Sequence, residues 1–292
     1  MPQIDELDLN DKSVLVIGGP TASGKSSLAL QAAIKYDGMV INADAMQVYQ
    51  NIPIITAAPT IQDKEKAPHK LYEIYPPSQK GNVADWLDLA VKEIKKAWRE
   101  KKLPIVAGGT GFYIENLIKG ASPIPNTKDE IKKQVAELMA QKDLKQVYEY
   151  LTEIDPDGAK MVNPNNTTRI RRALEIKLDT GESIAKWFKK PMINFLPEAD
   201  FMMIKLLPDL SELEKKCSQR FDEMMKLGAL QEVENLLALK LDKNLPAMNA
   251  IGVPELGDYL SGKIDLNEAV ALAKLHTRQY AKRQLTWFRN RG

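Results

Sequence analysis

Residues 19–26 read Gly-Pro-Thr-Ala-Ser-Gly-Lys-Ser and match the phosphate-loop pattern G-x-x-x-x-G-K-[ST]. An apolar, β-branched run at 13–18 precedes the loop and good helix formers at 27–33 follow it, which is the context that the pattern requires. Main-chain N–H groups, the helix N-terminus and Lys25 attract phosphate oxygens, and Ser26 can hold Mg²⁺. The loop therefore predicts a site for a di- or triphosphate. Its candidate binding residues are Gly19, Pro20, Thr21, Ala22, Ser23, Gly24, Lys25 and Ser26.

Two more polar loops follow predicted strands. Asp44 comes directly after the apolar run at 39–43, and Thr110 follows the run at 103–107. Ligands bind at the carboxyl ends of the strands in open α/β sheets, so both side chains are expected near the phosphate loop. Either residue alone could equally be a turn or cap residue, but three polar loops that converge on one edge indicate a site.

The order of these elements predicts an α/β fold, with a P-loop NTPase-like parallel sheet and crossover helices. A helix is expected over 83–101, and an apolar strand over 201–206 returns the chain to the sheet. The segment between them has helical periodicity, with Asp143 placed to cap one helix and another helix over 169–178. We therefore expect a catalytic core of residues 1–122 and 198–292 and an all-helical insertion of residues 123–197.

Composition narrows the class of protein. The chain has 292 residues, 44% of them hydrophobic, which is enough for a sizeable core. Its single cysteine, Cys217, excludes an intramolecular disulfide, and no cysteine or histidine spacing indicates zinc. The N-terminus lacks an apolar leader and no apolar run is long enough to span a bilayer. We expect a cytoplasmic monomer with no membrane partner.

Positive charge is concentrated although the net charge is only +2. Residues 168–191 contain seven Lys and Arg against three acids, and residues 274–292 contain six against none. Such segments are typical of a nucleic-acid-binding face, although solvated helix surface explains either one alone. Arg169 and Arg172 lie three residues apart and would share a helix face, where phosphate contacts or pairing with Glu175 or Asp179 are both open.

The motifs resemble the tRNA dimethylallyltransferase family, also called tRNA isopentenyltransferase. The phosphate loop is followed in order by Ala-Asp-Ala-Met-Gln-Val-Tyr at 43–49 and Ala-Gly-Gly-Thr-Gly-Phe-Tyr-Ile at 107–114. Residues 166–175 are similar to the family's R-I-x-R-A-L-E segment, and residues 277–289 are similar to its C-terminal helix. The resemblance thus spans nearly the whole chain.

This resemblance implies transfer of a dimethylallyl group from dimethylallyl diphosphate to the exocyclic amine, N6, of the adenosine just 3′ of the anticodon in tRNA. Asp44 is the candidate base for the weakly nucleophilic amine, and Lys25 with Mg²⁺ on Ser26 would stabilise the departing diphosphate. Thr110 would bind the phosphate or the amine, and Gln47 would read the adenine edge. The base must be flipped out, and the basic insertion would hold the anticodon stem-loop. The implied tRNA-contacting residues are Asp44, Ala45, Met46, Gln47, Thr110, Lys132, Thr168, Arg169, Ile170, Arg171, Arg172, Arg278, Lys282 and Arg283.

The chain departs from the family pattern at three places. Ala58 stands where members have a lysine, and Lys216 with Arg220 replaces a pair of arginines expected to face the diphosphate. Lysine keeps the charge there but loses the bidentate fork. Val253 and Pro254 replace a tyrosine and a lysine in a loop expected to face tRNA. The same reaction with altered tRNA contacts is expected.

Three other classes of protein remain open on the residues alone. A P-loop kinase for a nucleoside or small metabolite shares the fold and could use Asp44 as its base, although no arginine-rich lid or Walker-B Asp is evident. An RNA-binding or nucleotide-switch protein explains the basic segments but not Asp44 and Thr110 beside a phosphate loop. A transferase that prenylates free AMP would have little use for two basic segments.

Overall fold

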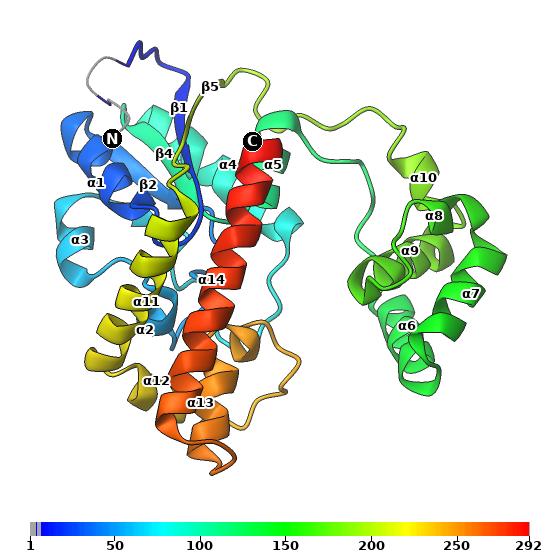
Figure 1. Cartoon of the computed structure of the whole chain (residues 1–292). Coiled ribbons are helices and arrows are strands. Elements are labelled where there is room, and N and C mark those ends of the chain that lie inside the picture. The colour runs from blue at the N-terminus through cyan, green and yellow to red at the C-terminus, as the bar shows by residue number, and fades with distance from the viewer. Residues whose placement is uncertain (1–3, 5–6, 292) are drawn as a thin grey trace. The chain divides into compact units, whose positions relative to one another are not determined.

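A parallel five-stranded sheet organises the chain. The computed structural model describes residue 4 and residues 7–291. Its strands are β1 (Ser13–Gly18), β2 (Gly38–Asn42), β3 (His69–Lys70), β4 (Leu103–Gly108) and β5 (Asp200–Lys205), in the order β3-β2-β4-β1-β5 (Figure 1). All four strand pairs are parallel, so the predicted α/β class is confirmed. Sequence reasoning missed only β3, which is too short to show a periodic pattern.

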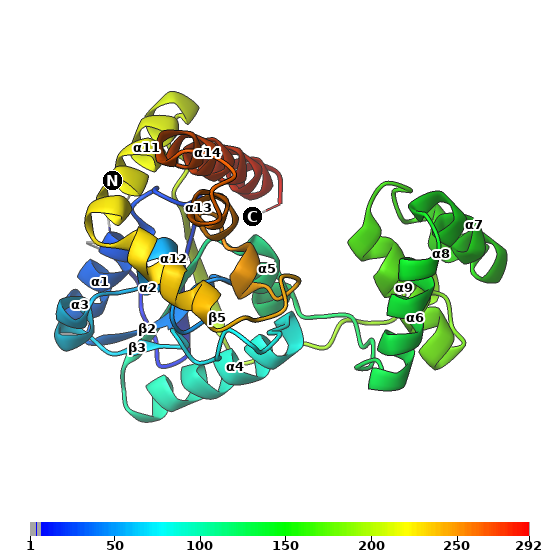
Figure 2. The ribbon, with the colours of Figure 1, turned by 90° about the horizontal axis from the view of Figure 1, so that it is seen from below.

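The chain divides into two compact units, one of residues 1–118 and 195–292 and one of residues 119–194. In the first unit, helix α1 (Lys25–Lys35) packs its buried alanines against side chains of β1, β2 and β4. Helix α4 (Val83–Arg99) contacts β2 and β4 and ends two residues before the predicted boundary at residue 101 (Figure 2). The remaining early helices are α2 (Pro53–Thr56), α3 (Ile61–Lys66) and α5 (Gly111–Lys119).

The C-terminal part of the first unit is helical. It contains α11 (Leu210–Lys226), α12 (Ala229–Ala238), the 3₁₀ turn η1 (Ala247–Asn249), α13 (Val253–Leu260) and α14 (Leu266–Asn290). Helix α14 packs along α11 and α13 and also closes onto the sheet edge. A side chain at Gly111 would meet the Trp287 ring at 2.2 Å, and one at Gly18 would meet Phe288 at 2.5 Å. Gly18 at the end of β1 and Gly111 at the start of α5 thus let α14 approach the loops that carry the candidate site.

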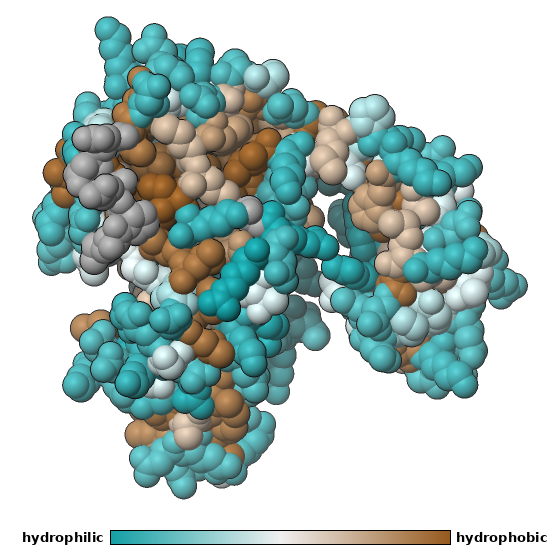
Figure 3. Space-filling model, turned by 45° about the horizontal axis from the view of Figure 1, so that its top comes forward, coloured by the Kyte–Doolittle hydropathy of each residue, from teal (hydrophilic) through white to brown (hydrophobic). Residues whose placement is uncertain are grey.

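The second unit is a helical bundle on its own core. It comprises α6 (Asp129–Gln141), α7 (Leu144–Ile154), α8 (Pro156–Lys160), α9 (Thr167–Thr180) and α10 (Ile184–Trp187). Val135, Val147, Leu151, Ile170 and Leu174 are buried together at its centre. Asp143 caps α7 through the main-chain N–H of Gln146, at 2.9 Å, as its position predicted. In Figure 3 the visible face of this second unit, on the right, is mostly hydrophilic and includes an apolar area.

No helix in the part of the chain that the structure describes combines the length and the apolar character needed to cross a membrane.

Candidate active site

The phosphate loop forms a cradle between β1 and α1. Gly24 precedes α1 with a left-handed φ of 91°, a conformation that glycine adopts without steric cost. Gly19 approaches the main chain closely enough that a Cβ would lie 2.6 Å from the Leu206 carbonyl oxygen. The Ser23 Oγ is buried and has no hydrogen-bond partner among the described residues. An unpartnered hydroxyl inside a loop of this shape fits a site that is completed by a bound anion.

Lys25 lies inside the cradle. Its Nζ donates to the Pro20 carbonyl oxygen at 2.6 Å, which folds the side chain back over the loop. Burial lowers the pKa of Lys25 from 10.5 to about 8, the nearby Asp44 carboxylate opposes that shift, and the Arg220 guanidinium adds to it. A bound diphosphate would favour the charged amine, so the cradle is electrostatically prepared for an anion.

Arg220 of α11 reaches the same loop. Its Nη1 donates to Thr21 Oγ1 at 3.1 Å and its Nη2 to the Thr56 carbonyl oxygen at 3.3 Å. Lys216, one turn earlier, pairs with Glu212 at 2.7 Å and is half-exposed. Lys216 and Arg220 line a hollow of about 340 Å³ together with residues 22–27. The two residues therefore contribute unequally: Arg220 is fixed against the loop, and Lys216 lies at its outer edge.

Asp44 follows β2 and is held by its own loop. Its N–H donates to Asn42 Oδ1 at 2.8 Å, and its Oδ1 accepts from the Met46 N–H at 2.9 Å. Asn42 is completely buried and also donates to the Leu71 carbonyl oxygen at 3.0 Å. The other carboxylate oxygen of Asp44, Oδ2, lies toward Gly109, where a Cβ would be 3.3 Å from it. Asp44 thus lies on a hydrogen-bonded turn, and its Oδ1 already accepts a hydrogen bond from the protein main chain.

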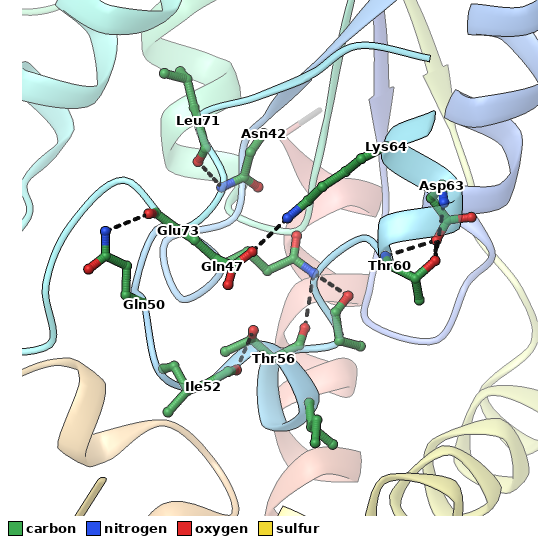
Figure 4. Close-up of polar contacts among 12 residues, drawn as sticks. Asn42, Gln47, Gln50, Ile52, Thr56, Thr60, Asp63, Lys64, Leu71 and Glu73 are labelled. Carbon is green, nitrogen blue, oxygen red and sulfur yellow. Dashed lines mark hydrogen bonds and ion pairs between the residues drawn. The ribbon is translucent and has the colours of Figure 1, made fainter. Parts of the chain in front are cut away.

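Gln47 lies three residues after Asp44, and its side chain is fixed by two hydrogen bonds. Its Nε2 donates to the carbonyl oxygens of Thr56 and Ala57, at 2.9 and 2.8 Å (Figure 4). Both amide protons are therefore used by the protein, and only Oε1 remains to meet a ligand. If Gln47 contacts an adenine, it does so as an acceptor.

One cavity of about 350 Å³ brings these groups together. Lys25, Asp44, Gln47 and Arg220 are among its polar lining residues. Ile55, Phe221, Met224, Ala250 and Ile251 form an apolar part of its wall. A cavity with a phosphate cradle, a carboxylate and an apolar wall suits an anionic ligand that carries a hydrocarbon group.

Comparison with known proteins agrees with this geometry. A family model described as IPP transferase matches residues 47–291. A tRNA dimethylallyltransferase of Zymomonas mobilis is 41% identical over 277 residues, which cover 95% of this chain and 88% of that protein. The chain belongs to the IPP transferase family. The tRNA dimethylallyltransferase of Rhodospirillum centenum is 42% identical, over 96% of this chain and 89% of that protein.

Solved structures of the family share the fold. The tRNA isopentenylpyrophosphate transferase of Bacillus halodurans has a TM-score of 0.68 and 32% identity, over 96% of this chain and 88% of that one. A structure titled as eukaryotic dimethylallyltransferase acting on tRNA has a TM-score of 0.81 and 31% identity, over 95% of this chain and 70% of that one. The P-loop-like fold that the motifs predicted is therefore shared with isopentenyltransferases.

The second unit distributes the transferase motif residues over two environments. Arg169 and Arg171 are exposed, and Thr168 and Lys132 are also on the surface. Arg172 instead donates to Thr127 Oγ1 at 2.6 Å and pairs with Glu175 at 3.5 Å. Ile170 is fully buried in the core of this unit, which corrects its assignment as a tRNA contact. The motif segment alternates between the two faces of α9, and only one of them can meet a ligand.

On α14 the basic residues differ in the same way. Lys282 and Arg283 are exposed, and Arg283 also lines the cavity. Arg278 is partly buried and its Nη1 lies 3.5 Å from Ser218 Oγ. Tyr280 lines the cavity, where burial and the negative charge of Asp44 raise its pKa. Sequence reasoning missed this tyrosine, although it lies four residues before Gln284 on the same helix and the periodicity could have placed them on one face.

The loop before α13 lines the cavity. Ala250 and Ile251 contribute to the cavity wall, and Val253 is buried at the start of α13. Pro254 occupies the first turn of α13, a position where its missing N–H costs nothing. At the two positions that depart from the family pattern, Pro254 therefore favours the start of the helix and Val253 packs in the core. The buried side chain of Val253 is not available for contact with tRNA.

Proposed function

We propose that this chain transfers a dimethylallyl group from dimethylallyl diphosphate to N6 of the adenosine 3′ of the anticodon in tRNA. The observation that carries the proposal is that Asp44 shares one cavity with Lys25, Arg220 and an apolar wall. A small-metabolite kinase needs the cradle, whereas a donor with a hydrocarbon group also needs the apolar wall beside it. The family membership of the chain points to the same reaction.

The phosphate loop would bind the diphosphate. Its N–H groups, Lys25 and Arg220 supply positive potential where negative charge develops as the allylic C–O bond breaks. Lys216, at the outer edge, would add a point charge. The apolar wall of Ile55, Phe221 and Met224 would hold the five-carbon group and exclude water. The diphosphate is released with the electron pair of the broken bond.

Asp44 would accept the proton. The nitrogen lone pair of the adenine amine is delocalised into the ring, so the new C–N bond forms as a proton leaves N6. Met46 N–H occupies Oδ1 of Asp44, which leaves Oδ2 for that proton. Gln47 Oε1 would accept a hydrogen bond from the N–H that remains on N6, and the Thr110 hydroxyl is free to donate because it uses only a lone pair toward the Ala45 N–H.

The residues at the cradle fit Mg²⁺ bound mainly through substrate. Ser26 is exposed at the start of α1, and no cluster of three or more potential ligands among His, Cys, Asp and Glu exists in the described ranges. Mg²⁺ commonly binds through diphosphate oxygens and few protein groups, so Ser26 would be its protein ligand. When bound, the ion would neutralise charge on the leaving diphosphate.

The second unit would bind the tRNA anticodon stem-loop through Arg169, Arg171, Thr168 and Lys132, and the first unit would contribute Arg278, Lys282 and Arg283. Exposed guanidinium and ammonium groups on a nearly neutral protein are suited to phosphate contacts. We place the enzyme in the cytoplasm as a monomer, acting on tRNA there.

A direct assay tests the function. The protein is incubated with unmodified tRNA, labelled dimethylallyl diphosphate and Mg²⁺, and label is expected in the adenosine 3′ of the anticodon. The same preparation is given ATP without tRNA, where no turnover is expected. A third reaction contains AMP in place of tRNA. Label in AMP but not in tRNA, or ATP turnover with no label in tRNA, would overturn the proposal in favour of one of the other classes.

A further inference from the structure

Gln284 is a buried polar side chain that joins two loops of the site. It lies on α14 with 6% of its surface exposed. Its Oε1 accepts from the main-chain N–H of Thr21 at 2.8 Å, and its Nε2 donates to the Gly109 carbonyl oxygen at 2.9 Å. One amide therefore spans from the phosphate loop after β1 to the loop after β4. A buried amide that lost either hydrogen bond would cost free energy. The two bonds therefore hold the Gln284 side chain, and the two loops that it contacts, in this arrangement.

Thr21 is fixed from both sides. Its N–H is held by Gln284 of α14, and its Oγ1 accepts from Arg220 Nη1 of α11 at 3.1 Å. A shift of Thr21 would therefore move the first half of the phosphate loop and release one hydrogen bond of the arginine that faces it. Gln284 thus acts on the cradle through Thr21 rather than by touching a phosphate.

Gly109 is fixed in the same way. A Cβ at Gly109 would lie 2.3 Å from Gln284 Nε2, so the glutamine amide occupies the space that a side chain would need. The same Cβ would lie 3.3 Å from Asp44 Oδ2, which places the reactive oxygen of the base next to this loop. The next residue, Thr110, accepts from the Ala45 N–H at 2.9 Å. The loop after β4, to which Gln284 is hydrogen-bonded, is therefore the loop that lies next to Asp44.

We infer that Gln284 is a positioning residue for prenyl transfer, setting the separation between the phosphate cradle and Asp44. The inference rests on the proposed function. Transfer requires the leaving oxygen, the allylic carbon and the amine nitrogen to line up, and misplacement by about 1 Å costs on the order of 100-fold in rate. The leaving oxygen is placed by the loop of Thr21 and the nitrogen by Asp44, and Gln284 is hydrogen-bonded at both ends.

Two variants separate the halves of the bridge. Gln284→Met keeps the length of the side chain and removes its hydrogen bonds to Thr21 and Gly109, together with its side-chain hydrogen bond with Tyr280. Gln284→Glu keeps the acceptor for Thr21 but loses the donor to Gly109 while the new carboxyl is ionised. Gln231→Met and Gln231→Glu, on the exposed surface of α12, are the matched controls. The single-turnover rate, the KM for each substrate, the melting temperature and the pH profile are measured for all four.

Gln284→Met is expected to lower the single-turnover rate by about 10- to 100-fold with the Kd for tRNA within about twofold of wild type. Gln284→Glu is expected to be similarly slow at pH 8, and its rate relative to wild type is expected to rise at pH 6, because the protonated carboxyl regains a donor for Gly109. A residue with only a structural role would not give that pH-dependent recovery. The Gln231 variants are expected to match wild type.

Rates of both Gln284 variants within threefold of wild type, measured on the folded fraction, would overturn the inference, as would a lower melting temperature with an unchanged rate. If Gln284→Met does not fold, the pH profile of Gln284→Glu decides the question. Failure of the wild-type protein to label tRNA would be a separate result that removes the proposed function itself and the inference with it.

Discussion

Thr110 Oγ1 accepts a hydrogen bond from the main-chain N–H of Ala45 at 2.9 Å. Thr110 is the second residue after β4, and Ala45 immediately follows Asp44 on the loop after β2, so this contact joins two neighbouring strand ends beside the candidate base. The Thr110 N–H adds a second tie, to the Ala43 carbonyl oxygen at 3.1 Å. Thr110 therefore has two tasks: it holds the Asp44 turn with a lone pair, and its O–H proton can still reach substrate.

Replacement of Thr110 by valine tests both tasks. Thr110→Val keeps the shape but leaves the Ala45 N–H without its partner, which costs about 1 to 3 kcal/mol when the group is buried. We expect a single-turnover rate lower by about 10- to 100-fold, whereas Thr110→Ser should stay within about fivefold because it keeps the hydroxyl. Equal rates for the valine and serine variants would show that the hydroxyl has no part in transfer.

Asp44→Asn is expected to keep the fold and the affinity for tRNA but to lower the single-turnover rate by about 100-fold or more, the usual contribution of a positioned general base. An amide preserves the acceptor for the Met46 N–H and cannot take the proton from N6. Asp88→Asn, on the exposed face of α4, is the matched control. A rate for Asp44→Asn within threefold of wild type would contradict the assignment of the base.

The pKa of Lys25 predicts how donor binding depends on pH. Because this pKa is lowered to about 8, the amine loses its charge above pH 8 in the unliganded protein. Diphosphate binding favours the charged amine, so the KM for dimethylallyl diphosphate should rise by up to about tenfold per pH unit above pH 8. Lys25→Arg stays charged throughout this range and should lose the pH dependence of KM. A KM of the wild-type protein that is flat from pH 7 to 9 would contradict this role of Lys25.

The same lowered pKa makes Lys25 unfavourable for folding. Between pH 8 and 10.5 the unfolded chain binds more protons than the folded one, so the free energy of unfolding should rise with pH in this window. At pH 7 Lys25→Met removes a buried cation and is expected to raise the free energy of unfolding by about 2 kcal/mol. Denaturant unfolding of both proteins without ligand checks this. An unchanged or lower stability of Lys25→Met would mean that burial of the amine carries no cost.

The sequence predicted those parts of the site that a local pattern encodes. The phosphate loop, Asp44 and Thr110 each follow a strand, and parallel strands bring their carboxyl ends to one edge. Gln284 could not be predicted, because its partner Thr21 is 263 residues away and nothing near either residue signals the contact. For Ile170 the local motif misled the prediction. Its neighbours Arg169 and Arg171 are exposed, but the helical periodicity of α9 places the Ile170 side chain in the core.

The separation of Arg169 from Arg172 gives a final test of tRNA binding. Arg169 is exposed on α9, whereas Arg172 is tied to Thr127 Oγ1 at 2.6 Å and to Glu175 at 3.5 Å. The pairing with Glu175 that the sequence left open therefore applies to Arg172. A guanidinium already engaged inside the unit is less available to a phosphate than one that faces solvent.

Arg169→Ala is expected to weaken tRNA binding and to reduce the slope of log K against log salt by about 0.7 to 0.9, the value for one lost phosphate contact. Arg172→Ala is expected to lower the free energy of unfolding by about 1 kcal/mol, because Thr127 and Glu175 lose their partner, and to change the salt slope by much less. Salt titrations of tRNA binding and melting curves of both variants distinguish the two roles. Equal changes of slope for the two variants would mean that Arg172 leaves Glu175 and contacts the tRNA backbone as well.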